Sequence, residues 1–293
     1  MKVMTMTRYG SPDVFHLADA AKPVPKDGEV LIKIRATTVT SAECAMRKGQ
    51  PVWGRLLIGL RKPRKKYRTL GIEFAGDIEA IGTNVTRFAK GDAVYGFAGF
   101  NIGTNAEYKC MPEKGSMAIK PANLTYEESA AAVDGTTTAL FFLRDKAQIQ
   151  RGQRVLINGA SGSIGTYAVQ LAKYFGANVT AVCSGRNADL VISLGADHVI
   201  DYTKTDFTDC SAQYDIIFDT IGKSTFRRCK RALKPEGVFI STTGLITNMA
   251  LSYWTSIMGG KRVKSGMSVE KNEGLVFIRH LIETGQIKPV IDR

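Results

Sequence analysis

Residues 155–165 read VLINGASGSIG, and this stretch decides the fold. Val155–Asn158 has the apolar composition of a buried strand, and the residues after Gly165 repeat apolar side chains at helical spacing until Gly176 ends the helix. A strand, a glycine turn and a helix in succession bring free backbone N–H groups and a positive helix end to one point. The stretch therefore predicts a site at which a pyrophosphate group binds.

The turn carries two of the three glycines of the G-x-G-x-x-G pattern. Ala160 stands at the first position, and Gly162 and Gly165 stand at the second and third. Gly162 would let phosphates approach the backbone, and Gly165 would let the helix pack tightly on the strand. A second apolar run, Ala177–Cys183, follows at the spacing of a βαβ unit, which favours a dinucleotide site over a glycine-rich turn in another α/β domain. The residues expected to bind the dinucleotide here are Ala160, Ser161, Gly162, Ser163, Ile164 and Gly165.

Length and composition indicate a globular protein with a sizeable core. The chain has 293 residues, of which 44% are hydrophobic. No apolar stretch approaches the ~18 residues of a membrane span, and the first residues lack the apolar core of a signal peptide. We therefore expect a soluble cytoplasmic protein with no membrane partner. The cysteines are odd in number and scattered, which predicts reduced core thiols at Cys44, Cys110, Cys183, Cys210 and Cys229.

The formal net charge is +13, and much of the excess lies in the run Arg61–Arg68. Smaller basic groups lie at Arg227–Arg231 and Lys261–Lys264. Such a charge permits nucleic acid, an acidic surface or a polyanionic cofactor as partner. Basic runs are usually solvated loops or helix faces, and no motif that reads DNA or RNA accompanies these. Nucleic acid is therefore not expected as a partner.

Residues 1–122 have the pattern of a β-rich domain. Val30–Ala36 and Gly71–Ile81 alternate at period two, and Asp92–Gly96 follows a glycine turn. Turn residues divide the segment into short strands of a compact barrel or sandwich. The stretch Ser41–Gly49 predicts one helical turn.

The pattern changes after residue 122. Thr125–Glu128 is a capping box at the start of an alanine-rich helix, and Gly135–Lys146 continues as a second helix. Six parallel strands with crossover helices are then expected, which predicts a doubly wound sheet. The strands after the Val155 unit are expected at Val179–Cys183, His198–Ile200, Asp215–Asp219, Gly237–Thr242 and Arg262–Gly266, and helices at Asn187–Leu194, Lys223–Leu233 and Ser268–Thr284.

A series of short motifs runs nearly from end to end of the chain. They are Gly71–Gly76, Gly91–Gly96, Ala106–Tyr108, Lys120-Pro121, Asn158–Gly165, Leu194–Asp197 with Asp201-Tyr202, and Phe218-Asp219. In this order the series resembles the medium-chain dehydrogenase/reductase superfamily, in its zinc-independent quinone oxidoreductase and ζ-crystallin-like branch. The resemblance implies an α/β fold: a GroES-like β-barrel catalytic domain at residues 1–122, a Rossmann NADP-binding domain at 123–285, and an active site in the cleft between them.

The resemblance also bears on the end of the chain and on assembly. Residues 286–293 are expected to return to the catalytic domain. Relatives usually continue past the position of Arg293 with a helix and a final strand, so either the chain is shortened or that strand is absent. Relatives often form homodimers by pairing their sixth Rossmann strands. A homodimer is expected here, although Arg262–Gly266 is short and interrupted by charges.

Zinc is not expected. Zinc-dependent relatives place a cysteine where Thr40 stands, a histidine where Ile72 stands, and a cysteine or carboxylate near Asp134. Threonine and isoleucine cannot replace a thiolate and an imidazole, and a catalytic zinc needs about three protein ligands. Four clustered cysteines for a structural zinc are absent from the sequence as well.

The expected cofactor is NADPH rather than NADH. NAD binders of this fold usually place a carboxylate at the end of the second strand, where this chain has Ser184, Gly185 and Arg186. A hydroxyl and a guanidinium suit a 2′-phosphate, which a carboxylate would repel. The resemblance places Tyr202 beside the adenosine phosphate. The nicotinamide end is expected near Thr138, Ile221, Gly222, Thr243, Gly244, Gly266 and Met267.

Without a metal, hydride passes from the dihydronicotinamide to a carbon that is already electrophilic, such as that of a quinone or an enone. Thr40 and Tyr95 are the candidate hydrogen-bond donors to the substrate oxygen. Residues 50–70 hold several apolar side chains and are expected to line or cover the substrate pocket. Two alternatives stay open: an NAD(P)-dependent alcohol or aldehyde dehydrogenase, and a non-catalytic RNA-binding or crystallin-like protein stabilised by NADPH.

Overall fold

A computed structural model describes residues 1–209 and 213–292. Contacts between Cα atoms divide the chain into two compact units. The first unit holds Met1–Asp134, Val269–Glu283 and the last residues from Ile291. The second holds Gly135–Ser268 and Thr284–Val290. Within the described residues, no helix has the length and apolarity to cross a bilayer.

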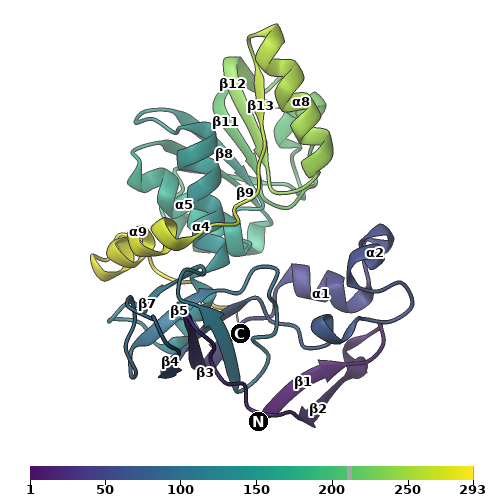
Figure 1. Cartoon of the computed structure of the whole chain (residues 1–293). Helices are drawn as coiled ribbons and strands as arrows, with labels where there is room; N and C mark the ends of the chain where they lie inside the picture. Colours follow the sequence, from purple (N-terminus) through teal and green to yellow (C-terminus); the bar gives the residue numbers. More distant parts are fainter. Residues whose placement is uncertain (210–212, 293) are drawn as a thin grey trace. The chain divides into compact units, whose positions relative to one another are not determined.

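The first unit is built on a five-stranded antiparallel sheet in the order β6-β3-β4-β5-β7 (Figure 1). Two register shifts between β3 and β4 bend these long strands around a core of branched and aromatic side chains. This confirms the predicted β-rich domain. The strands are β1 Lys2–Met6 and β2 Phe15–Asp19, which form a separate hairpin, and β3 Glu29–Thr37, β4 Glu73–Ile81, β5 Ala93–Phe97, β6 Tyr108–Pro112 and β7 Met117–Ile119.

Short helices flank this sheet. The predicted capping box is confirmed, because Thr125 and Glu128 cap each other at the start of α3. The single turn expected at Ser41–Gly49 is longer, since Thr40 and Glu43 form a second capping box that starts two turns of α1. The helices of this unit are α1 Ser41–Lys48, α2 Arg55–Ile58, α3 Tyr126–Ala131 and α9 Asn272–Glu283.

The second unit is a doubly wound sheet of six parallel strands in the order β10-β9-β8-β11-β12-β13, as predicted. The centre of β8 is buried on both faces, which is typical of a parallel sheet covered by helices. The strands are β8 Arg154–Asn158, β9 Asn178–Cys183, β10 His198–Asp201, β11 Tyr214–Asp219, β12 Leu233–Ser241 and β13 Arg262–Lys264.

Figure 1 shows α5 beside β8 and α8 beside β13. The helix expected at Lys223–Leu233 is much shorter, because β12 already begins at Leu233. Helix α8 was not predicted: it starts after Gly244, whose φ is 65°, and lacks a side-chain cap to mark its beginning. The helices are α4 Asp134–Leu140, continued by a π-helix over Phe141–Ala147, α5 Ser163–Tyr174, α6 Ala188–Ser193, α7 Phe226–Cys229 and α8 Leu245–Met258.

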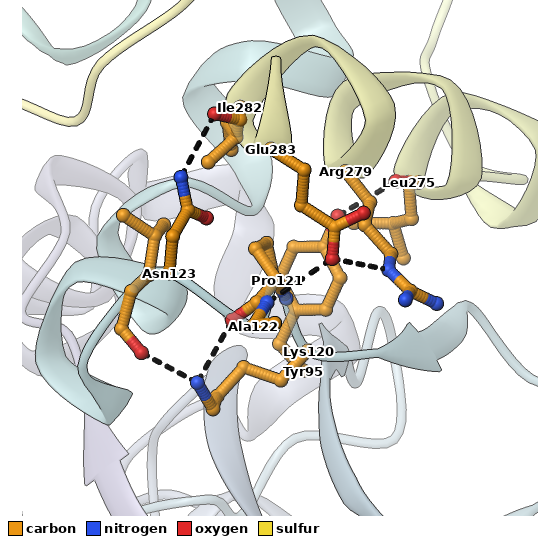
Figure 2. A network of polar contacts seen from close by, with 10 residues as sticks. Tyr95, Lys120, Pro121, Ala122, Asn123, Leu275, Arg279, Ile282 and Glu283 are labelled. Atoms are coloured by element: carbon orange, nitrogen blue, oxygen red, sulfur yellow. Dashed lines mark hydrogen bonds and ion pairs between the residues drawn. The ribbon is translucent and has the colours of Figure 1, made fainter. Parts of the chain in front are cut away.

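The observed boundaries differ from the predicted ones at 122 and 285. Helix α9 was expected in the Rossmann domain but packs within the first unit, where the phenol of Tyr95 donates a hydrogen bond of 2.6 Å to the carbonyl of Leu275 (Figure 2). Figure 2 also shows Ala122 N–H donating to Glu283 Oε1 at 3.1 Å. These pairs are far apart in sequence, so local patterns did not reveal them.

The segment Thr284–Val290 also departs from the prediction, because it belongs to the second unit. The side chain of Gln170 forms two hydrogen bonds with the backbone of Lys288, at 3.1 and 2.9 Å. Only the residues from Ile291 group with the first unit, so most of the run expected to return to the catalytic domain does not do so.

The cysteine prediction holds in part. Cys183 and Cys229 are free and buried, whereas Cys44 and Cys110 are free and only half-buried. Cys210 lies outside the described residues.

Candidate active site

The predicted cofactor residues lie along one edge of the second unit. Each predicted group follows the carboxyl end of a different parallel strand. Ligands of open α/β sheets bind at this edge. The groups are Ala160–Gly165 after β8, Ser184–Arg186 after β9, Tyr202 after β10, Ile221 and Gly222 after β11, Thr243 and Gly244 after β12, and Gly266 and Met267 after β13.

The glycine turn leaves the start of α5 uncapped and close to β8. Gly162 is exposed and is the N-cap of α5, and no side chain among the described residues caps this helix end. A Cβ on Gly165 would lie 2.1 Å from the carbonyl oxygen of Gly159, so only glycine lets the helix approach the strand this closely. Ser161 Oγ accepts a hydrogen bond of 2.9 Å from Asn187, which ties the turn to the loop after β9. The free amides of α5 therefore face solvent and fit an anionic group.

The adenosine end of the expected site lies at the ends of β9 and β10. Asp201 pairs in register with Cys183, which brings Tyr202 to the level of Ser184. Arg186 and Tyr202 are exposed and Ser184 is half-buried. This part of the unit brings together a hydroxyl, a guanidinium and a phenol.

The sequence analysis missed a carboxylate at this end of the site. A Cβ on Gly185 would lie 2.6 Å from Asp201 Oδ2. Hydrogen bonds from the hydroxyl and N–H of Thr203 lower the pKa of Asp201, so this group is ionised at neutral pH. Its charge is partly satisfied by these donors and by the N–H of Gly185.

Asp219 organises the loops expected at the nicotinamide end. Its side chain is fully buried and accepts a hydrogen bond of 3.1 Å from Asn158 Nδ2. It also accepts from three N–H groups of the following loop, those of Ile221, Gly222 and Ser224, at 3.3, 3.2 and 2.9 Å. The sequence analysis quoted Asp219 as a motif residue without a role. A carboxylate at the end of an apolar strand was the signal that could have identified it.

The other predicted nicotinamide residues lie beside α4 and its π-helical extension. Thr138 is buried in α4, and a Cβ on Gly135 in the same helix would lie 2.9 Å from Ser163 Oγ. The starts of α4 and α5 are thus in contact. A Cβ on Gly266 would lie 2.6 Å from the side chain of Lys146, and Met267 is exposed.

Of the two predicted substrate donors, Tyr95 is wrong. Its side chain is 0% exposed, and its hydroxyl is committed to the carbonyl of Leu275. Burial raises the pKa of this phenol far above its usual range. Tyr95 therefore holds α9 in place, and it cannot reach a substrate.

Thr40 is the N-cap of α1. Its hydroxyl donates to Glu43 Oε2 at 3.1 Å and accepts from the N–H of Glu43 at 3.2 Å. The residue is half-buried. The hydroxyl thus has a structural role in the cap, and its contact with a substrate stays a prediction.

A cluster of ionisable side chains, formed by buried Glu43, Glu73 and Lys271 and half-buried Asp134, was missed. Asp134 N–H donates to Glu73 Oε1 at 2.6 Å, and Lys271 Nζ lies 2.8 Å from Asp134 Oδ1. Thr38 hydrogen-bonds the other oxygen of Glu73. The members come from four separate parts of the chain, so only the fold brings them together.

Glu73 is only 4% exposed. Its burial, followed by the nearby charge of Asp134, raises its pKa to about 8. Burial also raises the pKa of Glu43. Glu73 is therefore protonated at neutral pH, and it can donate or release a proton beside Thr38.

The positions of the zinc ligands of other relatives do not form a donor set here. Ile72 is buried in an apolar cluster with Met6 and Leu70, and Thr40 is occupied by its cap. No group of three histidine, cysteine or acidic side chains suited to a metal occurs within residues 1–209 and 213–292. Zinc independence itself stays a prediction.

Comparisons with known proteins agree with both units. Residues 26–121 match the family described as alcohol dehydrogenase GroES-like domain, and residues 194–293 match that described as zinc-binding dehydrogenase. A 2-methylene-furan-3-one reductase of Solanum lycopersicum is 32% identical over 303 residues, which cover 100% of this chain and 71% of the relative. A chloroplastic NADPH-dependent alkenal/one oxidoreductase of Arabidopsis thaliana is 28% identical over 303 residues, which cover 100% of this chain and 72% of the relative.

Among solved structures, the quinone oxidoreductase from Coxiella burnetii has a TM-score of 0.88 and 27% sequence identity. The alignment covers 100% of this chain and 90% of that one. The fold expected from the resemblance, a GroES-like domain with a Rossmann domain, is thereby confirmed. The chain is therefore an oxidoreductase and belongs to the medium-chain dehydrogenase/reductase superfamily, in its quinone oxidoreductase-like branch.

Proposed function

We propose that the protein is an NADPH-dependent reductase that transfers hydride to a quinone or an enone without a metal. The observation that carries the proposal is that the predicted cofactor residues lie along the carboxyl edge of the parallel sheet, where the start of α5 is also uncapped. The names of the enone and quinone reductases that the chain resembles support the substrate class.

The second unit would bind the cofactor. The first amide of α5, at Ser163, would hold the pyrophosphate with Gly162 leaving room for its approach, and Ser184 and Arg186 would hold the 2′-phosphate. When bound, NADPH supplies hydride from C4 of its dihydronicotinamide. The loops that Asp219 fixes would orient the ring, and good orientation contributes several kcal/mol to catalysis.

The first unit would supply the proton. Hydride addition to an enone or a quinone leaves a negatively charged oxygen or carbon that needs a proton. Glu73 is protonated at neutral pH and hydrogen-bonds Thr38, which is half-buried. We assign Glu73 and Thr38 as the pair that supplies this proton, which we name the proton reserve. Thr40 would be a further hydrogen-bond donor to the substrate oxygen.

The test is a turnover assay with purified protein, in which loss of NADPH absorbance is followed with quinones, alkenals, alcohols and aldehydes. We expect reduction of the first two classes, with a rate that a chelator leaves unchanged. Zinc at stoichiometric level together with loss of activity on chelation would favour an alcohol dehydrogenase. Absence of any thermal shift with NADPH or NADH would refute the proposal.

Two further expectations belong to this proposal. Strand β13 is an edge strand of three residues, so its backbone groups are open to pairing with a second copy, and a homodimer is proposed on that ground. Its test is sedimentation of the purified chain. A cytoplasmic location also stays a prediction, which fractionation of cells would check.

A further inference from the structure

The segment around α2 exposes an unusual number of large apolar side chains. Five of nine consecutive residues are large, apolar and between 64% and 72% exposed: Val52, Trp53, Leu56, Leu57 and Leu60. Scattered apolar residues on a surface need no explanation, but a contiguous group of this kind marks an interaction site. Figure 1 locates it in the first unit, by the label α2.

The backbone of this segment is held in place. Tyr9 donates a hydrogen bond of 2.6 Å to the carbonyl of Gly59, and Arg55 donates one of 2.9 Å to the carbonyl of Gly49. The N–H of Arg64 donates to the carbonyl of Ile58 at 2.9 Å. Beyond the segment, Tyr67 and Leu70 pack in an apolar core. The fold therefore presents these apolar side chains outward on an anchored loop.

A basic run follows the apolar group directly. Its exposed members are Arg61, Lys62, Arg64, Lys65 and Lys66. The sequence has no acidic residue between Glu43 and Glu73, so nothing in the segment neutralises this charge. Apolar and cationic side chains thus lie within one stretch of fifteen residues, 52–66, which we name the anchor segment.

We propose that the anchor segment binds the surface of a bilayer that contains anionic lipids. A membrane interface accepts tryptophan and leucine side chains at the acyl boundary, and anionic headgroups attract lysine and arginine. Stable attachment takes two such signals together, and the anchor segment holds both. The sequence analysis expected no membrane partner, because it found neither a membrane span nor the apolar core of a signal peptide. The exposure of residues 52–60 is visible only in the structure.

Helix α8 forms a second exposed apolar surface, and comparing it with the anchor segment shows why a lipid surface is the expected partner of the anchor segment. Helix α8 also exposes large apolar residues, among them Ile246, Tyr253 and Trp254. Its fourteen residues include no charged side chain, and it lies beside the edge strand β13. The adjacent polybasic run is what favours an anionic lipid surface at the anchor segment, whereas a second copy of the chain would gain nothing from it.

The two tryptophans make a direct test. Trp53 lies in the anchor segment and Trp254 lies in α8, and the chain has no other tryptophan. The full-length Trp254→Phe variant therefore reports on Trp53 alone, and the matched Trp53→Phe variant reports on Trp254 alone. Each is mixed with vesicles of phosphatidylcholine, or of phosphatidylcholine with about a third phosphatidylglycerol.

We expect the emission of Trp254→Phe to shift to shorter wavelength with the phosphatidylglycerol vesicles only, and the protein to float with them. Salt should reverse both effects. The Trp53→Phe variant should show no shift. A shift confined to Trp53→Phe would overturn the proposal, as would a shift of Trp254→Phe that rises with protein concentration without vesicles.

A charge series completes the test. Each basic side chain near an anionic surface contributes about fivefold to partitioning, so Lys65→Gln/Lys66→Gln should weaken vesicle binding by about 25-fold. The control is Lys230→Gln/Arg231→Gln, which removes two exposed charges from the second unit and should leave binding unchanged. Equal loss in both variants, or equal binding to the two vesicle types, would show that no specific anchor exists.

Discussion

Replacing Glu73 by glutamine should change how the stability of the protein depends on pH. Glu73 is buried and its pKa is raised to about 8, whereas the unfolded chain has the ordinary value of 4.5. Between these two values the folded state holds a proton that the unfolded state releases. The stabilisation is thus complete below pH 4.5 and is lost as the pH rises through 8.

The magnitude follows from the shift. Each pH unit in this window removes about 1.4 kcal/mol from the free energy of unfolding, so the loss from about pH 5 to pH 8 is about 4 kcal/mol. The Glu73→Gln variant has no proton to lose at this site. Its amide oxygen can accept from Asp134 N–H as the carboxyl does, and its amide nitrogen can donate to the Thr38 hydroxyl, which donates to Glu73 in the native protein.

The assay is urea unfolding of both proteins, followed by circular dichroism at several pH values. As the pH rises from about 5 to 8, the unfolding free energy of the native protein should fall by about 4 kcal/mol relative to that of Glu73→Gln. The matched control is Glu79→Gln, because Glu79 is paired with Lys22 and its pKa is lowered. That variant should follow the native protein between pH 6 and pH 8.

Parallel curves for the native protein and Glu73→Gln would refute the reasoning, since they would mean that Glu73 titrates as it does in the unfolded chain. The same variant tests the proposed proton reserve. We expect its turnover number with an enone to fall while the KM for NADPH stays unchanged, because Glu73 belongs to the first unit.

Three further predictions concern single residues. The Arg186→Gln variant should raise the KM for NADPH about tenfold or more and leave that for NADH nearly unchanged, since a charged hydrogen bond to phosphate contributes about 1.5–3 kcal/mol; equal effects on both cofactors in steady-state kinetics would contradict this role. The Gly165→Ala variant places a Cβ 2.1 Å from Gly159 O and should lower both Tm and the NADPH-induced thermal shift, whereas a native thermal profile would mean that the contact relaxes freely. The Tyr95→Phe variant removes the hydrogen bond from the phenol to the carbonyl of Leu275 and should cost about 1 kcal/mol in urea unfolding, with kcat unchanged; a large fall in kcat at native stability would restore Tyr95 as a catalytic residue.

Local sequence patterns predicted much of the secondary structure of the second unit. The βαβ unit at Val155–Cys183 and the capping box at Thr125 depend on residues within a few positions of one another, so periodicity and capping rules identify them. The shared edge of the predicted cofactor residues was also predictable, because the carboxyl ends of parallel strands lie at one edge whatever the loops contain. The strand order was not predicted and came from the structure.

The sequence by itself determined the fold class, the glycine turn and the positively charged and hydroxyl groups of the expected cofactor site, since these depend on neighbouring residues. Only the tertiary structure decided that Tyr95 is buried under α9, that Glu73, Asp134 and Lys271 form one cluster, and that Trp53 is exposed. Burial and the pKa of a carboxyl group depend on side chains that are distant in sequence. No spacing along the chain encodes them.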